Sequence, residues 1–324
     1  IAGDINVYAK DIWVTNDADI TTTNNGNILI KSSTFVASAA NSDFTTDGGD
    51  IILWANSDGT NTSASEIVLN GTNSLISSGG DIVLAGGTTT DAEGRPSGYA
   101  YRGGSNYAGV SLGKSSAITL ESSGGDIIIK GKTGASADQG VYAYAGLKID
   151  SGAGIINIDG ISGNSNSGVE LSNGTADTAI TSSSILSNAI SIKGESTNGG
   201  IGLRLANSAD NNTDLLIQAS GIGGGISIEG ISNNNHGYYG MTDGTLQVLA
   251  QSGDIVLKGL NSSGATGAAN ADFKNASAAS TFYLGNRKDS SAINGITPLV
   301  TTSSSNITMQ SDYFSWDSAE PLIN

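Results

Sequence analysis

The sequence predicts an all-β protein: a single-stranded, right-handed parallel β-helix, or solenoid, of roughly ten to twelve rungs. Three observations predict this fold. A short unit, Gly-Asp-Ile-x-aliphatic, recurs along the chain, the segments between copies turn at Gly, Asn or Ser, and no amphipathic helix of ordinary length interrupts them. Near-copies of the unit read TDGGDIILWAN from Thr46, SSGGDIVLAGG from Ser77, SSGGDIIIKGK from Ser122 and QSGDIVLKGL from Gln251.

The first isoleucine of each unit marks one rung. The spacings between these isoleucines are 23, 23, 31, 45, 29, 34, 36, 29 and 52 residues, and repeats of roughly 20–50 residues indicate solenoids, propellers or arrays. The last and longest spacing predicts a further, degenerate rung near Phe282 to Leu284. The isoleucines are Ile5, Ile28, Ile51, Ile82, Ile127, Ile156, Ile190, Ile226, Ile255 and Ile307.

Each unit reads as a short strand, because apolar residues alternate with other residues, as at Ile51 and Leu53. Further short strands such as Val110–Leu112 and Val169–Leu171 fill the intervals, which gives two or three strands per turn. In a parallel β-helix the inward aliphatic residues of neighbouring rungs stack about 4.8 Å apart. A propeller is the less favoured alternative, since its blades need hairpin turns and evenly spaced aromatic residues.

Aligned rungs place charges of alternating sign at one position, which predicts a ladder of exposed ion pairs worth about 0–1 kcal/mol each. The outward position between the two aliphatic residues is apolar in the first half of the chain and polar in the second half. We expect the segment from Thr88 to Gly109 to cover that apolar stripe. The alternating charges are Lys130, Asp159, Lys193, Glu229 and Lys258, and the outward residues are Leu29, Ile52, Val83 and Ile128, then Asn157, Ser191 and Ser227.

Two regions follow from the pattern. Residues 1–260 carry the β-helix repeats, and residues 261–324 carry degenerate terminal rungs with an insertion and an aromatic cap, in which Phe314 and Trp316 plug the last coil. The chain begins at Ile1 within a repeat, so we expect it to be a processed or excised piece of a longer protein.

Composition excludes several classes of function. The net charge is −16 and the pI is about 4.2, which argues against nucleic acid and anionic lipid as partners, because both require surplus Lys and Arg. There is no cysteine, so disulfides and thiolate metal sites are excluded. No stretch approaches the roughly 20 apolar residues of a membrane span, so we expect no membrane insertion.

We predict that the protein is not an enzyme, and that it has no catalytic residue, no metal site and no cofactor. The single histidine, His236, lies in a loop-like run, SNNNHGYYG, where we expect it to be exposed to solvent. Calcium-binding repeat spacings are absent, although acidic corners leave adventitious calcium open. The repeated aspartates are expected to cap backbone amides at corners rather than act in catalysis; they are Asp4, Asp50, Asp81, Asp126 and Asp254.

Tyrosine is the best candidate for recognition. Its flat apolar ring and polar tip suit stacking on sugar rings or contact with protein. Three tyrosine-bearing runs, SGYAYRGGSNYAGV, DQGVYAYAG and HGYYGMT, fall just before or within the strand that follows a Gly-Asp-Ile unit, so they share one side of the solenoid. Packing at corners is the alternative role. The candidate ligand-binding residues are Tyr99, Tyr101, Arg102, Tyr107, Tyr142, Tyr144, Tyr238 and Tyr239.

The tandem GGDIxLxA units, the GVxL strands and the Gly-, Asn-, Ser- and Thr-rich corners resemble the filamentous-haemagglutinin-like exoproteins of bacterial two-partner secretion. The resemblance runs roughly from Ile1 to Gly259. It implies a long right-handed β-helical adhesin that is exported to the bacterial cell surface. This chain lacks the Asn-Pro-Asn-type motif of that family's secretion domain, so the resemblance places it in the repeat shaft. Polysaccharide lyases and phage tailspikes share similar low-complexity repeats.

Three functions therefore compete. The first is a structural and adhesive shaft of an exported surface protein, which binds host, cell or matrix glycans or proteins weakly and many times over. The second is a polysaccharide-degrading β-helix enzyme, a lyase or hydrolase. The third is a subunit of a self-assembling extracellular filament, because uncapped solenoid ends and edges can pair end to end or laterally.

Overall fold

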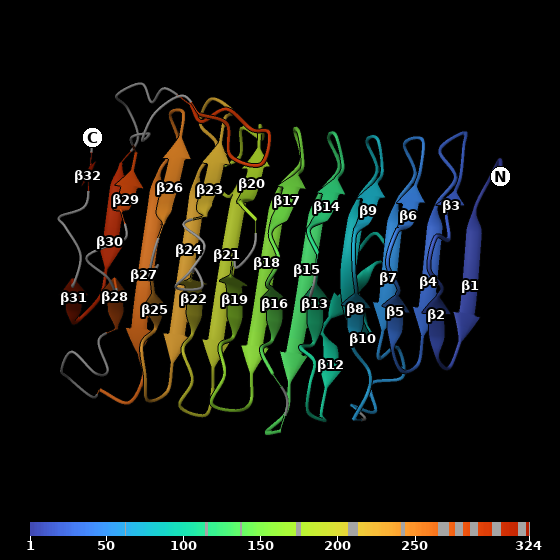
Figure 1. Cartoon of the computed structure of the whole chain (residues 1–324), viewed down its shortest axis with the longest axis horizontal. Helices are drawn as coiled ribbons and strands as arrows, with labels where there is room; N and C mark the ends of the chain where they lie inside the picture. Colours follow the sequence, from blue (N-terminus) through green and yellow to red (C-terminus); the bar gives the residue numbers. More distant parts are fainter. Residues whose placement is uncertain are drawn as a thin grey trace.

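The structure, a computed structural model, describes residues 1–61, 63–113, 116–136, 138–172, 176–206, 213–240, 244–264, 272–275, 281–285, 291–299, 306–316 and 322–323. Within these residues the chain forms three long parallel sheets that run side by side along an elongated rod (Figure 1). Ten successive coils each give one strand to each sheet. The prediction of an all-β parallel β-helix is therefore confirmed. The described residues contain no helix long and apolar enough to cross a membrane.

The strands of the three sheets alternate regularly along the chain. The first sheet contains β1 (Ile5–Ala9), β4 (Ile28–Ser32), β7 (Ile51–Ala55), β10 (Ile82–Thr90), β15 (Ile127–Thr133), β18 (Ile156–Ser162), β21 (Ile190–Ser196), β24 (Ile226–Ser232), β27 (Ile255–Asn261) and β30 (Ile307–Gln310). The second contains β2 (Ile12–Val14), β5 (Val36–Ser38), β8 (Ile67–Leu69), β13 (Val110–Leu112), β16 (Val141–Ala143), β19 (Val169–Ser172), β22 (Leu203–Ala206), β25 (Tyr238–Tyr239), β28 (Phe273–Asn275) and β31 (Phe314–Trp316). The third contains β3 (Ile20–Thr21), β6 (Ser42–Thr45), β9 (Asn73–Ile76), β14 (Ile118–Glu121), β17 (Leu147–Asp150), β20 (Thr178–Ser182), β23 (Asp214–Ala219), β26 (Thr245–Ala250), β29 (Thr281–Leu284) and β32 (Leu322–Ile323).

The first sheet aligns the repeated isoleucines in one row, as the spacing predicts. Ile51 pairs with Ile82, and Ile82 pairs with Ile127 on the next coil. These inward side chains are fully buried, and their stacking forms one continuous core along the rod. The expected extra rung near Phe282 is wrong. Phe282 lies in β29 of the third sheet, and β27 pairs directly with β30, so the long spacing reflects long connections.

The alternating charges also lie in register, with Lys130 beside Asp159 and Glu229 beside Lys258. Of the four neighbouring pairs in this row, one forms an ion pair, in which Lys258 Nζ lies 3.1 Å from Glu229 Oε1. Lys130 instead donates to the carbonyl of Ser97 at 3.1 Å. The register of the predicted ladder is thus confirmed, but most of its charges have other partners.

The segment between Thr88 and Gly109 folds over the first sheet. It contains β11 (Pro96–Gly98), which pairs antiparallel with β10, and β12 (Ala100–Arg102), which pairs with the second half of β15. An ion pair between Arg95 and Asp81 ties it to the corner that precedes β10. The outward side chain of Val83 is fully buried. The predicted cover of the apolar stripe is confirmed at this residue.

Two polar ladders hold the corner before the first sheet. Asp50 Oδ1 accepts a hydrogen bond from the amide of Asp81 at 2.8 Å, and Asp81 Oδ1 accepts one from the amide of Asp126 at 2.7 Å. Asp4, Asp126 and Asp254 bond to the next coil in the same way, so the predicted corner-capping role is confirmed. A second ladder, of buried hydroxyls such as Ser122 bonded to the carbonyl of Gly125 at 2.5 Å, was not predicted.

The last coils differ from the others in the core of the second sheet. The inward row there is aliphatic up to Leu203 and then becomes Tyr238, Phe273 and Phe314. The rings of Tyr238 and Phe273 stack with centroids 4.1 Å apart, and Phe314 packs on Phe273 at 5.5 Å. Residues beyond 261 therefore continue all three sheets. The side chain of Trp316, the other residue of the expected cap, lies outside the described residues.

Candidate functional site on the outer face of the second sheet

The outer face of the second sheet gathers aromatic and charged side chains in one row along the rod. The row contains one outward residue from each strand, because side chains on a strand alternate between faces and the coils are in register. In order of coils, its members are Trp13, Ala37, Val68, Ser111, Tyr142, Glu170, Arg204, Tyr239, Lys274 and Ser315.

At the corner before the second sheet, the backbone packs closely against the backbone of the first sheet. The residue before each central strand of the second sheet is glycine, as at Gly168 before β19. A Cβ on Gly168 would lie 2.1 Å from the amide nitrogen of Glu195, which belongs to β21 of the first sheet. Only glycine allows this approach. The glycine of the GVxL pattern therefore lies at the corner where the first and second sheets meet, and the variable residue x, two positions later, points outward from the second sheet.

The middle of the row contains a small polar network. Glu170 accepts hydrogen bonds at Oε2 from Gln139 Nε2 at 2.8 Å and from Ser167 Oγ at 3.3 Å. Its Oε1 lies 3.5 Å from Arg204 Nη1 on the next coil. The Arg204 guanidinium carbon lies 5.7 Å from the centroid of the Tyr239 ring, within cation–π range. These contacts orient a carboxylate, a guanidinium and an aromatic ring on one surface.

Tyr142 lies beside this network in the row. Burial, and then the nearby Glu170 carboxylate, raise the pKa of the Tyr142 hydroxyl, so it stays protonated and can donate hydrogen bonds at any physiological pH. The ring of Tyr144 lies 6.0 Å away from that of Tyr142, centroid to centroid. The two tyrosines form an aromatic patch that is half-buried.

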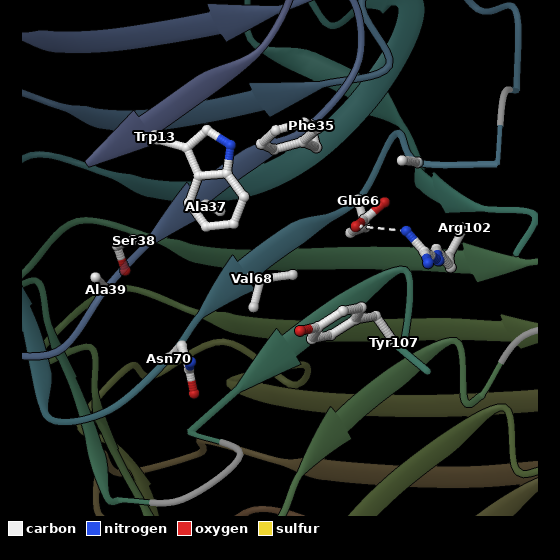
Figure 2. A pocket seen from close by; sticks show the side chains of 11 residues that line it. Trp13, Phe35, Ala37, Ser38, Ala39, Glu66, Val68, Asn70, Arg102 and Tyr107 are labelled. Carbon is white, nitrogen blue, oxygen red and sulfur yellow. Dashed lines mark hydrogen bonds and ion pairs between the residues drawn. The ribbon is translucent and has the colours of Figure 1, made fainter. Parts of the chain in front are cut away.

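At the N-terminal end the row opens into a shallow hollow of about 290 Å³. Figure 2 shows Trp13 and Phe35 on one side, Tyr107 on the opposite side, and Ala37 and Val68 between them. Trp13 is 69% exposed, and its ring meets Phe35 edge to face with centroids 5.2 Å apart. The hollow therefore offers aromatic walls and an apolar floor to a ligand.

Glu66 and Arg102 form the polar wall of this hollow (Figure 2). Arg102 Nη1 lies 2.8 Å from Glu66 Oε1, and the two side chains are 15% and 7% exposed. Burial raises the pKa of Glu66, and the positive charge of Arg102 opposes that rise. Arg102 also donates to the carbonyls of Gly104 and Ser105 within the inserted segment, and its ion pair with Glu66, which directly precedes β8, ties that segment to the second sheet.

The structure separates the predicted tyrosines. Tyr142, Tyr144 and Tyr239 lie on the outer face of the second sheet, and Tyr107 and Arg102 lie at its hollow. These five residues share one side of the solenoid, as expected.

The remaining three candidates lie elsewhere. Tyr99, in the inserted segment, donates to Asp159 Oδ2 of β18 at 2.6 Å. Tyr101, in β12 of the same segment, pairs with Lys132 of β15 in the first sheet. Tyr238 is 1% exposed. Its assignment as a ligand-binding residue is wrong, because the alternation of β25 turns Tyr238 into the core and Tyr239 outward.

The expected exposure of His236 is also wrong. His236 is 6% exposed, and its ring lies 5.5 Å from that of Tyr239. Asn233 and Asn234 of the same corner are exposed, whereas His236 and Gly237, directly before β25, are buried, so the polar neighbours of His236 did not indicate its own exposure.

Trp13, Phe35, Glu66, Glu170 and Arg204 were not predicted as site residues. Three of them, Trp13, Phe35 and Glu66, follow no shared motif, because residues that do not face the core are free to vary. The one available signal was the x of GVxL, which holds Tyr142, Glu170 and Arg204 in GVYA, GVEL and the related GLRL.

Within the described part of the chain, no group of three or more His, Asp and Glu side chains is arranged to hold a metal ion. Glu170 and Arg204 of the row, and Glu66 and Arg102 of the hollow, instead pair with one another or with neutral polar groups. Comparison with protein-family models, curated proteins and solved structures gives no match to this chain.

Proposed function

We propose that the chain is the structural and adhesive shaft of an exported bacterial surface protein. In this proposal the outer face of the second sheet is the contact surface, and its partners are glycans or proteins of a host, another cell or the surrounding matrix. The observation that carries the proposal is the single outward row in which Trp13, Tyr142, Arg204 and Tyr239 follow one another along the rod.

The length of the outward row suits many weak contacts with a single extended partner. Ten coils at about 4.8 Å per step place the first and last members of the row about 43 Å apart, so one extended partner can meet several side chains together. Linked contacts of this kind gain affinity without any single strong site. Aromatic rings and arginine are also the side chains enriched in binding surfaces.

The alternative of a polysaccharide-degrading enzyme has less support. The aspartates that repeat at the corners each accept a hydrogen bond from a backbone amide of the next coil, as Asp81 does from Asp126. Their carboxylates are thus engaged as backbone caps, and Asp81 is also paired with Arg95, so these contacts explain the repeated aspartates without a catalytic role. Incubation with a panel of pectins and alginates, followed by product analysis, tests this alternative directly.

A glycan array combined with a pull-down from host and bacterial surface extracts tests the proposed contact surface. We expect the whole chain to bind a defined set of targets, and Tyr142→Ala with Tyr239→Ala to remove most of that binding. Tyr8→Ala is the control, because Tyr8 is a strand tyrosine, 65% exposed, that lies on the first sheet rather than on the second. Equal loss in the control, or no loss in the double variant, would contradict the proposal.

A further inference from the structure

A segment from near the end of the chain lies across the outer face of the third sheet. Residues 293–299 belong to the connection between β29 and β30, the strands of the ninth and tenth coils, and Figure 1 shows part of this connection as a red-orange loop beside β20. Ile293 forms an apolar cluster, separate from the main core, with outward residues of the sixth, seventh and eighth coils. These are Ala179 of β20, Leu216 of β23 and Leu249 of β26.

Two hydrogen bonds fix the segment at coils that lie far from it in the chain. Asn294 Nδ2 donates to the carbonyl of Leu147 in β17 at 3.2 Å, across 147 residues. The amide of Leu299 donates to Gln218 Oε1 in β23 at 2.7 Å, across 81 residues. Because β17 belongs to the fifth coil, the segment bridges coils that do not contact one another through the sheets.

A tight turn sets the shape of the segment. Ile293 and Ile296 exchange backbone hydrogen bonds of 2.8 and 3.0 Å. Between them, Asn294 and Gly295 both have positive φ, 47° and 78°. Asn-Gly is the dipeptide that favours this type of turn, because both residues tolerate the conformation. The turn thus places both isoleucines against the cluster and the Asn294 amide against β17.

The outward row of the third sheet changes character where the segment covers it. The row is polar on the second to fifth coils and becomes apolar on the next two. Its members in order are Asp43, Ser74, Thr119, Lys148, Ala179 and Leu216. Leu216 and Leu249 are fully buried although they lie outside the main core. Exposing them would cost free energy, so the apolar contact favours the closed segment.

This arrangement differs from the ordinary behaviour of a solenoid. Each coil of a solenoid contacts its neighbours, so an end can open one coil at a time. Residues 293–299 add contacts between the connection that follows the ninth coil and the fifth to eighth coils. Unravelling that proceeds along the chain from its C-terminal end reaches these contacts after the tenth coil and before β29.

We propose that residues 293–299 are a clasp that joins the fifth to ninth coils into one cooperative unit and stops unravelling from the C-terminal end after the tenth coil. The clasp lies on the third sheet and the proposed contact surface lies on the second, so this inference does not depend on the adhesive role. It gives the C-terminal half of the rod a means to keep its coils in register when the rod is pulled.

Hydrogen exchange of the full chain at low urea concentrations, measured by mass spectrometry, tests the clasp. We expect peptides from β20, β23, β26 and β29 to open in one shared transition. Ile293→Asp should raise the exchange rates of β26 and β29 at least about tenfold and let them open before β20, because a buried carboxylate opposes closure. Ile222→Asp is the matched control, since Ile222 follows β23 on the seventh coil but is 74% exposed; it should leave these rates unchanged.

A milder variant keeps the test valid if Ile293→Asp fails to fold. Gln218→Ala removes the acceptor of the Leu299 amide and leaves the apolar cluster in place, so the same peptides should exchange about fivefold faster, as for one lost hydrogen bond. Three results would overturn the clasp. They are faster exchange confined to residues 291–299, unchanged exchange of β26 and β29 in Gln218→Ala, and separate opening of β20 and β29 in the unmodified chain.

Discussion

Replacing Arg102 with methionine removes the counter-charge of a buried carboxylate. Glu66 is 7% exposed in its side chain, and its Oε1 lies 2.8 Å from Arg102 Nη1. Loss of one partner of such a pair costs about 3–5 kcal/mol, because the remaining charge is buried without compensation. We expect Arg102→Met to lower the free energy of unfolding by about that amount at pH 7.

The cost should depend on pH. Burial already raises the pKa of Glu66 above its ordinary value of 4.5, and loss of the opposing Arg102 charge raises it further. Between the unfolded pKa and this higher folded pKa the folded state binds more protons than the unfolded state, so stability falls as pH rises through that window. Below about pH 4.5 the carboxyl is protonated in both states, and the penalty at Glu66 disappears.

Urea denaturation followed by circular dichroism at pH 4 and pH 7 measures this difference. Glu66→Met combined with Arg102→Met should recover most of the stability lost at pH 7, since neither charge is then buried. The remainder reflects the hydrogen bonds of Arg102 to Gly104 and Ser105, worth about 1 kcal/mol each. An equal loss at both pH values, or a double variant no more stable than Arg102→Met, would refute the reasoning.

Three further changes test the fold by urea denaturation at pH 7. Tyr238→Phe should raise stability by about 1–3 kcal/mol, because its hydroxyl is buried without a hydrogen-bond partner among the residues that the structure describes; a loss of stability would mean that the hydroxyl is paired. Leu84→Ala should cost about 2–5 kcal/mol, since Leu84 is fully buried in the stacked core, and a cost below 1 kcal/mol would contradict that stacking. Asp126→Ala should cost about 0.5–2 kcal/mol, as for other backbone caps, by removing the acceptor 3.0 Å from the amide of Ile155; the Asp4→Ala control at the terminal coil should cost less.

Sequence reasoning was accurate where every coil must repeat the same contact. The isoleucine series, the aspartate caps and the in-register charges all follow from stacking identical positions on a neighbouring coil. It failed where chain connections vary. The long spacing before Ile307 was explained by a missing rung, while the structure places Phe282 in a third-sheet strand of the same coil.

The candidate site was predicted only in part, for a related reason. Tyr142 and Tyr239 were identified, but Trp13, Glu66 and Arg204 were not, because outward residues carry no repeat that marks them. Tyr238 and Tyr239 are adjacent and chemically alike in the sequence. The strand register alone decides that Tyr238 stacks on Phe273 in the core while Tyr239 faces outward.

The sequence by itself determined the repeating coil and its stacking. Repeated aliphatic residues, glycine corners and capping aspartates are each satisfied only by contact with the same position on the next coil, so they allow one regular arrangement. Only the tertiary structure decided which side chains from separate coils meet. Glu66 and Arg102 are brought together by the inserted segment, and Trp13 joins them across the second sheet. These contacts depend on the path of the connections between strands and on the direction of each side chain, and local sequence patterns specify neither.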